Sequence, residues 1–383
     1  MGRALTGSVY RRGDTWAVLV DVGQDPATGR RKRHYKGGFK TKREAEAYKA
    51  QVLVELQRGA FVEPAKITVA EYAERWLASV KPNLAPRTWQ GYELNLRKHV
   101  LPFIGQAELS KLQPLALQGI YSTLLERGLA PRTVLYVHRT LHRMLEMAVK
   151  WGLVGRNVAD AVEPPKQQRK EPQVLDEEQA GRLMAGISDL RLLVPVAIAL
   201  GTGLRRGEVL GLKWQDVDLE AHCIHILQTV QRLPGEGIVT LPTKTNKSRR
   251  TVIISPGLVD ILRAWRKQQL QERLAAGPLW RDTGFVCTAP DGGPLDPDWL
   301  TKAFARTVRA LGLPPVRFHD LRHSQATYLL KRGVHPKVVQ ERLGHSSITV
   351  TMDIYSHVLP TMQKEAARAV DPIFSRAAAK WRT

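Results

Sequence analysis

The segment at residues 163–172, EPPKQQRKEP, most constrains how this chain can fold. It has prolines near both ends, charged and polar residues between them, and no large apolar side chain to bury. Proline interrupts helices and central strands, so neither kind of element can run through the segment. We therefore expect a linker here, with folded parts at residues 1–162 and 173–383.

Residues 1–62 show short strand-like runs followed by a helical pattern. The strand-forming runs lie at 8–10, 15–22 and 30–35, and turn sequences separate them. Thr41 and Glu44 have the spacing of a capping box, which predicts a helix to about residue 58. Three strands and a helix predict a small DNA-reading domain, although a solvated charge run on a small scaffold would look similar. The predicted DNA contacts in this part are Arg30, Arg31, Lys32 and Arg33.

Residues 63–162 predict an all-α domain of four or five helices. Apolar residues at 69, 72, 73, 76 and 77 follow helical spacing. The sequence LAPRT occurs at 84–88 and again at 129–133, and proline at a helix start places the next residue near the positive end of the helix dipole. Arg87 and Arg132 are therefore predicted phosphate contacts, unless LAPRT only marks two ordinary helix starts.

Residues 173–383 form the largest part and mix helical periodicity with a β-region at about 222–254. This mixture predicts an α+β domain. The predicted fold is thus multidomain: a small three-stranded β-sheet plus helix, then an all-α domain, then an α+β domain.

The charge of the chain indicates its partner. Lys and Arg number 58 against 36 Asp and Glu, which gives a net charge of +22 that is spread over all three parts. A polyanion such as double-stranded DNA suits this excess, because each neutralised phosphate releases condensed counterions. On charge alone, a ribosomal-type binding protein or a generally basic surface is the alternative.

Several features predict a cytoplasmic protein that does not enter a membrane. The chain has two cysteines, too few for a disulfide framework, which favours a reducing compartment. Its first residues lack the apolar core of a signal peptide. The longest plain apolar stretch, residues 192–200, is far shorter than the ~20 residues that span a bilayer.

Two segments of the third part display basic residues at defined places. TGLRRGE at 202–208 follows an apolar helix and precedes another, which places Arg205 at their junction, although an ordinary surface arginine is the alternative. TKTNKSRR at 243–250 lies between strand-like residues 237–241 and 251–254, which predicts a hairpin with a basic tip. A lysine such as Lys244 can there enter a DNA groove and protonate a leaving oxygen, although a purely electrostatic tip is the alternative. Lys247, Arg249 and Arg250 are predicted DNA contacts.

Two further segments contribute histidines. HDLRH at 319–323 opens a helix, and the i, i+3 spacing puts His319 and Arg322 on one face. A cationic fork beside an acid/base group suits a phosphate in its transition state. A metal site is the rival interpretation, but the histidines lack a cysteine partner or an HExxH pattern, so no metal is expected.

LGHSS at 343–347 ends a helix that begins near residue 336, leaving His345 just beyond its C-terminus. The next helix would carry Tyr355. Because Tyr355 shares a face with Ile348 and Met352, an ordinary core position is the alternative.

Together, these four segments resemble the signature of the tyrosine recombinase (lambda-type phage integrase) family. The matching motifs are TGLRxGE, KT followed by SRR, HDLRH, and LGH with a tyrosine ten residues after its histidine. The match in order and spacing covers the third part closely. Residues 63–162 resemble, more loosely, the core-site DNA-binding domain of that family, and residues 1–62 resemble its arm-site-binding domains. The family often has Asn-Pro where this chain has Asn157-Val158, which affects the linker geometry.

The resemblance implies a role for each matching residue. Tyr355 would attack the scissile phosphodiester, forming a 3′-phosphotyrosyl bond and freeing a 5′-hydroxyl. Arg205 and Arg322 would hold the non-bridging oxygens, and Lys244 would protonate the leaving oxygen. His319 would be the acid/base partner of the tyrosine, and His345 would donate to the phosphate.

The resemblance also implies the biological activity. We expect a site-specific recombinase of a bacterial host cell that integrates, and in the reverse direction excises, a phage or mobile element without metal, ATP or another cofactor. A homotetramer on DNA and accessory DNA-bending or excision proteins are its implied partners. The apolar residues near 366–374 would dock on a neighbouring protomer or fold back on their own domain. A type IB topoisomerase-like enzyme and a catalytically silent DNA-binding regulator are the alternatives.

Overall fold

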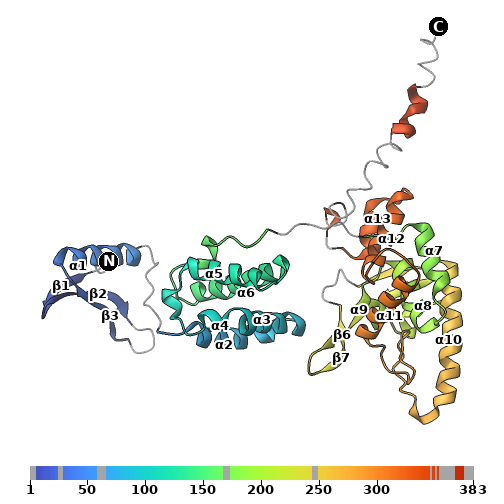
Figure 1. Cartoon of the computed structure of the whole chain (residues 1–383), viewed down its shortest axis with the longest axis horizontal. Helices are drawn as coiled ribbons and strands as arrows, with labels where there is room; N and C mark the ends of the chain where they lie inside the picture. Colours follow the sequence, from blue (N-terminus) through green and yellow to red (C-terminus); the bar gives the residue numbers. More distant parts are fainter. Residues whose placement is uncertain are drawn as a thin grey trace, which may run out of the picture. The chain divides into compact units, whose positions relative to one another are not determined.

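The structure, a computed structural model, describes residues 6–24, 29–57, 66–166, 173–243, 249–345, 347–349, 352 and 367–374. The chain divides into two compact units, Met1–Gln168 and Arg169–Thr383 (Figure 1). The division falls inside the segment 163–172.

The first unit begins with a three-stranded antiparallel sheet in the order β1-β2-β3. Its strands are β1 (Gly7–Arg12), β2 (Thr15–Gln24) and β3 (Arg31–Phe39), and helix α1 (Lys42–Gln57) packs on one face of the sheet. The predicted capping box is present, because Thr41 Oγ1 accepts from the Glu44 N–H and the Glu44 carboxylate accepts from the Thr41 N–H. The predicted small sheet with one helix is therefore confirmed.

The remainder of the first unit is helical, as predicted. A capping box between Thr68 and Glu71 starts α2, and Trp76 of that helix stacks on Tyr92 inside the core. The helices are α2 (Val69–Val80), α3 (Pro86–His99), α4 (Leu101–Ile104), α5 (Pro114–Glu126) and α6 (Pro131–Lys150), with 3₁₀ turns at Lys81–Asn83, Leu109–Lys111 and Val158–Ala161.

The two LAPRT segments start α3 and α6, with proline as the first helical residue in each. Asn95 contacts Thr140 whereas Tyr92 contacts Arg143, so these two helices are antiparallel. The two helix starts consequently lie at opposite ends of the pair and do not form a joint site.

The second unit surrounds α8 (Leu190–Thr202), which is buried along most of its length and packs against α10 and α12. Its other helices are α7 (Glu177–Gly186), α9 (Arg206–Gly211), α10 (Pro256–Ala276), α11 (Pro297–Ala310), α12 (Asp320–Lys331) and α13 (Pro336–Leu343). Its strands are β4 (Val217–Asp218), β5 (Cys223–Ile226), β6 (Gln228–Leu233), β7 (Gly237–Pro242) and β8 (Arg250–Ile253). The predicted α+β class is confirmed.

The predicted hairpin between residues 237–241 and 251–254 is wrong. Strand β7 pairs with β6, and β8 pairs with β5 in a separate sheet of order β4-β5-β8. A tight turn with Gly235 and Gly237 at positive φ closes the β6–β7 hairpin locally. Strand β8 instead buries Val252 against the core that holds Ile224. Residues 243–249 therefore connect two sheets.

Candidate active site

Arg205 lies at the junction between α8 and α9, where the sequence predicts it. Gly203 ends α8 in the left-handed conformation at φ 71°, and a Cβ there would also meet Leu343 and Gln325, so glycine is required for both reasons. Arg205 then serves as the N-cap residue of α9. Its Nη2 donates to the Gly344 carbonyl at 3.4 Å, and its side chain is 42% exposed, which leaves it accessible to a ligand.

Arg322 approaches the same junction from α12. Its Nη1 donates to the carbonyl of Gly203 at 2.6 Å, and the residue is 2% exposed. The last carbonyls of a helix have no partner within the helix, so this arginine satisfies one at the end of α8. His319 immediately precedes α12, and its ring meets that of His323 edge-on with centroids 5.3 Å apart.

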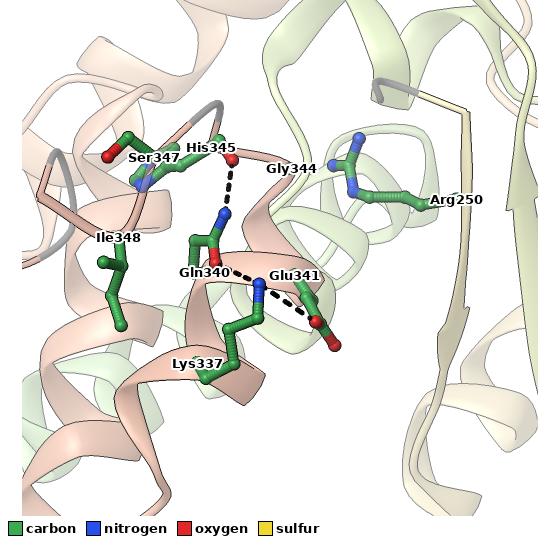
Figure 2. Close-up of a pocket in the computed structure, with 8 residues that line it drawn as sticks. All are labelled: Arg250, Lys337, Gln340, Glu341, Gly344, His345, Ser347 and Ile348. Carbon is green, nitrogen blue, oxygen red and sulfur yellow. Dashed lines mark hydrogen bonds and ion pairs between the residues drawn. The ribbon is translucent and has the colours of Figure 1, made fainter. Parts of the chain in front are cut away.

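His345 follows the end of α13 as predicted. Gly344 ends the helix in the left-handed conformation, and the backbone of His345 is held by Gln340 through two hydrogen bonds. Figure 2 shows Gln340 between this backbone and Lys337, which also pairs with Glu341. An open pocket of about 640 Å³ adjoins these residues, lined by Arg250, Lys337, Gln340, Glu341, Gly344, His345, Ser347 and Ile348.

The pKa values of the histidines place four predicted residues in one electrostatic cluster. Burial, followed by the charges of Arg322 and Arg205, lowers the pKa of His345 to about 3. Burial and Arg322 also lower the pKa of His319, with a smaller contribution from Arg205. Both imidazoles are therefore neutral at neutral pH, and a neutral imidazole can donate one hydrogen bond and accept another.

The second unit is expected to lose stability as the pH falls from about 6.5 to about 3. Burial lowers the pKa of His323 to about 4 and that of His345 to about 3, from an ordinary 6.5. Below pH 6.5 these histidines take up protons in the unfolded chain but not in the folded chain. Protonation therefore favours the unfolded chain, and stability that is present above pH 6.5 is lost as the pH falls. The melting temperature of the DNA-free protein measures this loss. The double variant His323→Gln/His345→Gln should show a flatter profile, and parallel profiles would contradict the explanation.

Glu208 is an important site residue to which the sequence interpretation gave no role. Its carboxylate accepts from the backbone N–H and Nη1 of Arg205 at 3.0 and 2.9 Å, and from Nη2 of Arg250 at 2.9 Å. Burial alone would raise the pKa of Glu208, but the bonds and charges of Arg250 and Arg205 lower it overall, so the group is ionised. A signal was present in the sequence, since Glu208 follows Arg205 by three residues, at the capping-box position of a short helix.

The Glu208→Gln substitution is expected to destabilise the second unit by about 3 kcal/mol, because two arginines lose a buried carboxylate. Chemical denaturation measures the change. Glu177→Gln is the matched control, since Glu177 forms an exposed ion pair with Arg332 that should contribute less than about 1 kcal/mol. Equal effects of the two substitutions would show that the Glu208 pairs contribute no more than a surface ion pair.

Arg250 does not lie at an exposed tip. It is the first residue of β8, and its side chain is 8% exposed beside Glu208, whereas the neighbouring Arg249 is exposed. DNA contact by either residue stays a prediction. Lys244, Lys247 and Tyr355 lie outside the described residues, and their roles stay predictions too.

The predicted DNA contacts of the first unit are exposed. Arg30 to Arg33 are exposed at the start of β3, although Arg31 pairs with Asp21, and Arg87 and Arg132 are exposed in the first turns of their helices. The strand register adds three candidate DNA contacts, which the run of basic residues in the sequence did not indicate. Tyr10, Arg12 and Tyr35 lie with Arg33 on the sheet face opposite α1, and Arg12 donates to the Tyr35 hydroxyl at 2.9 Å.

Neither a metal-binding cluster nor a membrane-spanning helix occurs among the described residues. They contain no group of three or more His, Cys, Asp or Glu side chains arranged to hold a metal ion. No helix in the described part of the chain is both long and apolar enough to cross a membrane.

Comparison with protein families matches three consecutive parts of the chain. Residues 173–362 match the phage integrase family. Residues 68–125 match the N-terminal SAM-like domain of phage integrases, and residues 8–56 match the Arm DNA-binding domain.

Named relatives align over most of the chain. The tyrosine recombinase XerC-like protein of Caldanaerobacter subterraneus is 28% identical and covers 96% of this chain and 99% of its own length. The ICEBs1 integrase of Bacillus subtilis is 28% identical over 94% of this chain and 97% of its own. The tyrosine recombinase XerC of Mesorhizobium japonicum is 30% identical over 78% and 94%.

Solved structures share the fold. The Tn1549 transposon integrase in complex with a circular intermediate DNA matches with a TM-score of 0.69 and 23% identity, covering 79% of this chain and 99% of that one. The lambda integrase tetramer bound to a Holliday junction matches with a TM-score of 0.55 and 19% identity, covering 91% and 98%.

Proposed function

Since this chain belongs to the tyrosine recombinase (phage integrase) family, which cleaves and rejoins DNA, we propose that it is the integrase of a phage or another mobile element. One observation carries the chemistry of this proposal: Arg322 reaches the end of α8 at Gly203, Arg205 reaches the Gly344 carbonyl beside His345, and both charges act on the neutral histidines His319 and His345. A phosphodiester gains negative charge during substitution at phosphorus, and two arginines beside imidazoles can stabilise that charge.

In the proposed mechanism, the hydroxyl oxygen of Tyr355 attacks phosphorus and forms a 3′-phosphotyrosyl ester. The bond between phosphorus and the 5′-oxygen breaks, and the 5′-oxygen leaves. Arg205 and Arg322 contact the non-bridging oxygens, where negative charge accumulates. Lys244 gives its proton to the leaving oxygen, and His319 accepts the proton of the tyrosine. His345 donates a hydrogen bond to the phosphate. The 5′-hydroxyl of another strand reverses these steps, so neither metal nor ATP is needed.

The choice of an integrase rests on the N-terminal part, since residues 8–56 match the Arm DNA-binding domain. We propose that the sheet face with Tyr10, Arg12, Arg33 and Tyr35 contacts arm-site DNA. Arg87 and Arg132 are proposed to contact phosphates of the core site. Lys247 and Arg249 are proposed to follow the DNA backbone near the scissile bond.

The proposed assembly is a homotetramer on DNA that acts in the bacterial cytoplasm. The lambda integrase that shares this fold was solved as a tetramer on a Holliday junction. Residues 367–374 are helical and expose Val370, Ile373 and Phe374, which suits docking on a neighbouring protomer. DNA-bending or excision proteins are proposed as accessory partners.

Supercoiled plasmid carrying the DNA that flanks the gene tests the proposal. The purified protein is incubated with it in EDTA, beside a plasmid of equal length without that DNA, and covalent adducts are mapped. Adducts at defined positions on the first plasmid alone are expected. Equal relaxation and dispersed cleavage of both plasmids would instead indicate a topoisomerase. Tight binding without adducts would favour a silent regulator.

A further inference from the structure

Arg342, in the last turn of α13, joins two other elements through its guanidinium group. Nη1 donates to the carbonyl of Ile253 at 2.9 Å, and Nη2 donates to the carbonyl of Gly201 at 2.6 Å. We infer that Arg342 is a positioning residue for strand cleavage, which holds the segments bearing the catalytic groups in register. This inference rests on the proposed function.

The joined segments lie near proposed catalytic residues in the sequence. Gly201 lies in the last turn of α8, four residues before Arg205. Ile253 ends β8, the strand that follows the segment with Lys244. Arg342 itself precedes His345 by three residues. One guanidinium group therefore joins the end of α8, the end of β8 and the end of α13, which are far apart in the sequence.

A second set of contacts closes a ring through the same residue. The backbone carbonyl of Arg342 accepts from Nε of Arg250 at 2.9 Å, and Arg250 pairs with Glu208, which in turn pairs with Arg205. Arg342 thus reaches Arg205 by two routes, one through the end of α8 and one through the buried carboxylate. Loss of its side chain would leave only the second route.

The chemistry of the contacts explains why arginine occupies this position. The final carbonyls of α8 lack helical partners, and two arginines supply donors: Arg322 to Gly203 and Arg342 to Gly201. A planar guanidinium group can bridge carbonyls of two elements, whereas a lysine ammonium group is a point charge on a flexible stem. Burial lowers the pKa of Arg342, and within the described residues no carboxylate lies within ion-pair distance of it. Its role is therefore geometric.

Arg342→Ala and Arg342→Lys test the inference, with Arg332→Ala as control. Arg332 lies at the end of α12, and its side chain is exposed beside Glu177. The control therefore removes the same charge from a residue that does not take part in the contacts among Arg342, Arg250, Glu208 and Arg205. The melting temperature of each variant is measured first, and DNA affinity and the rate of adduct formation at saturating plasmid are then measured below the melting transition. Alanine at 342 is expected to slow adduct formation by about 100-fold, as small misplacements of reacting groups do, with less than about a 3-fold change in DNA affinity.

Lysine at 342 is expected to give an intermediate rate, and guanidinium chloride should restore part of the rate of the alanine variant, whereas equal NaCl should not. A residue that only stabilised the fold would change the melting temperature without this chemical rescue. If the alanine variant does not fold, the lysine variant decides. Wild-type rates in the folded variants, or losses explained wholly by DNA affinity, would overturn the inference. Absence of adducts from the wild-type protein would instead overturn the proposed function, and the inference with it.

Discussion

Replacing Tyr355 with phenylalanine is expected to abolish the covalent DNA adduct, slowing strand cleavage by about 10⁴-fold or more. Phenylalanine keeps the ring and removes only the oxygen that would bond to phosphorus. The arginines that hold the phosphate remain, so the affinity for DNA should change little.

Labelled DNA from the mapped cleavage position, separated on a denaturing gel after incubation in EDTA, measures the adduct. Tyr328→Phe is the matched control, because Tyr328 is a partly exposed tyrosine of α12 that lies beside Arg332. That variant should form adducts at the wild-type rate. Adducts that persist in Tyr355→Phe would assign the nucleophile to another residue.

Replacing Arg322 with alanine is expected to slow cleavage by about 10²–10³-fold, the usual cost of losing one preorganised donor to a developing negative charge. The same change leaves the buried carbonyl of Gly203 without its Arg322 donor, which should lower the free energy of unfolding by about 1–3 kcal/mol. Arg322 thus links the chemistry of the site to the end of α8.

Lysine at position 322 separates the two effects. It keeps the positive charge but cannot contact the Gly203 carbonyl and both phosphate oxygens together, so its rate should stay well below wild type. Cleavage rates and denaturation curves are compared with those of Arg309→Ala, an exposed arginine in the last turn of α11. A folded Arg322→Ala protein that cleaves as fast as this control would remove Arg322 from the mechanism.

Local signals in the sequence predicted much of the fold. The capping box at Thr41, the prolines that start α3 and α6, and the glycines that end α8 and α13 each act within one turn of chain. Their residues need no distant partner, so the element ends and the junction that presents Arg205 could be predicted.

Local sequence signals could not predict contacts between distant segments. The pairing of β8 with β5 depends on burial of Val252 in a shared core, which the sequence around residue 250 does not indicate. Arg250 consequently appeared as one more basic residue, although it pairs with Glu208, 42 residues earlier. Arg342 likewise acts on Gly201 and Ile253, and no motif connects these positions.

The lowered pKa of His345 has a thermodynamic consequence for the life of the enzyme. Burial is the main cause of this lowered pKa, and the charges of Arg322 and Arg205 lower it further, so these arginines create a positive potential at the site. A phosphate that enters relieves this potential, so DNA is a ligand of the native state and shifts the folding equilibrium by mass action. At a concentration 100 times the dissociation constant, such a ligand adds about 2.7 kcal/mol to the stability. Molecules bound to DNA are therefore expected to unfold less often than free molecules, and so to resist proteolysis for longer.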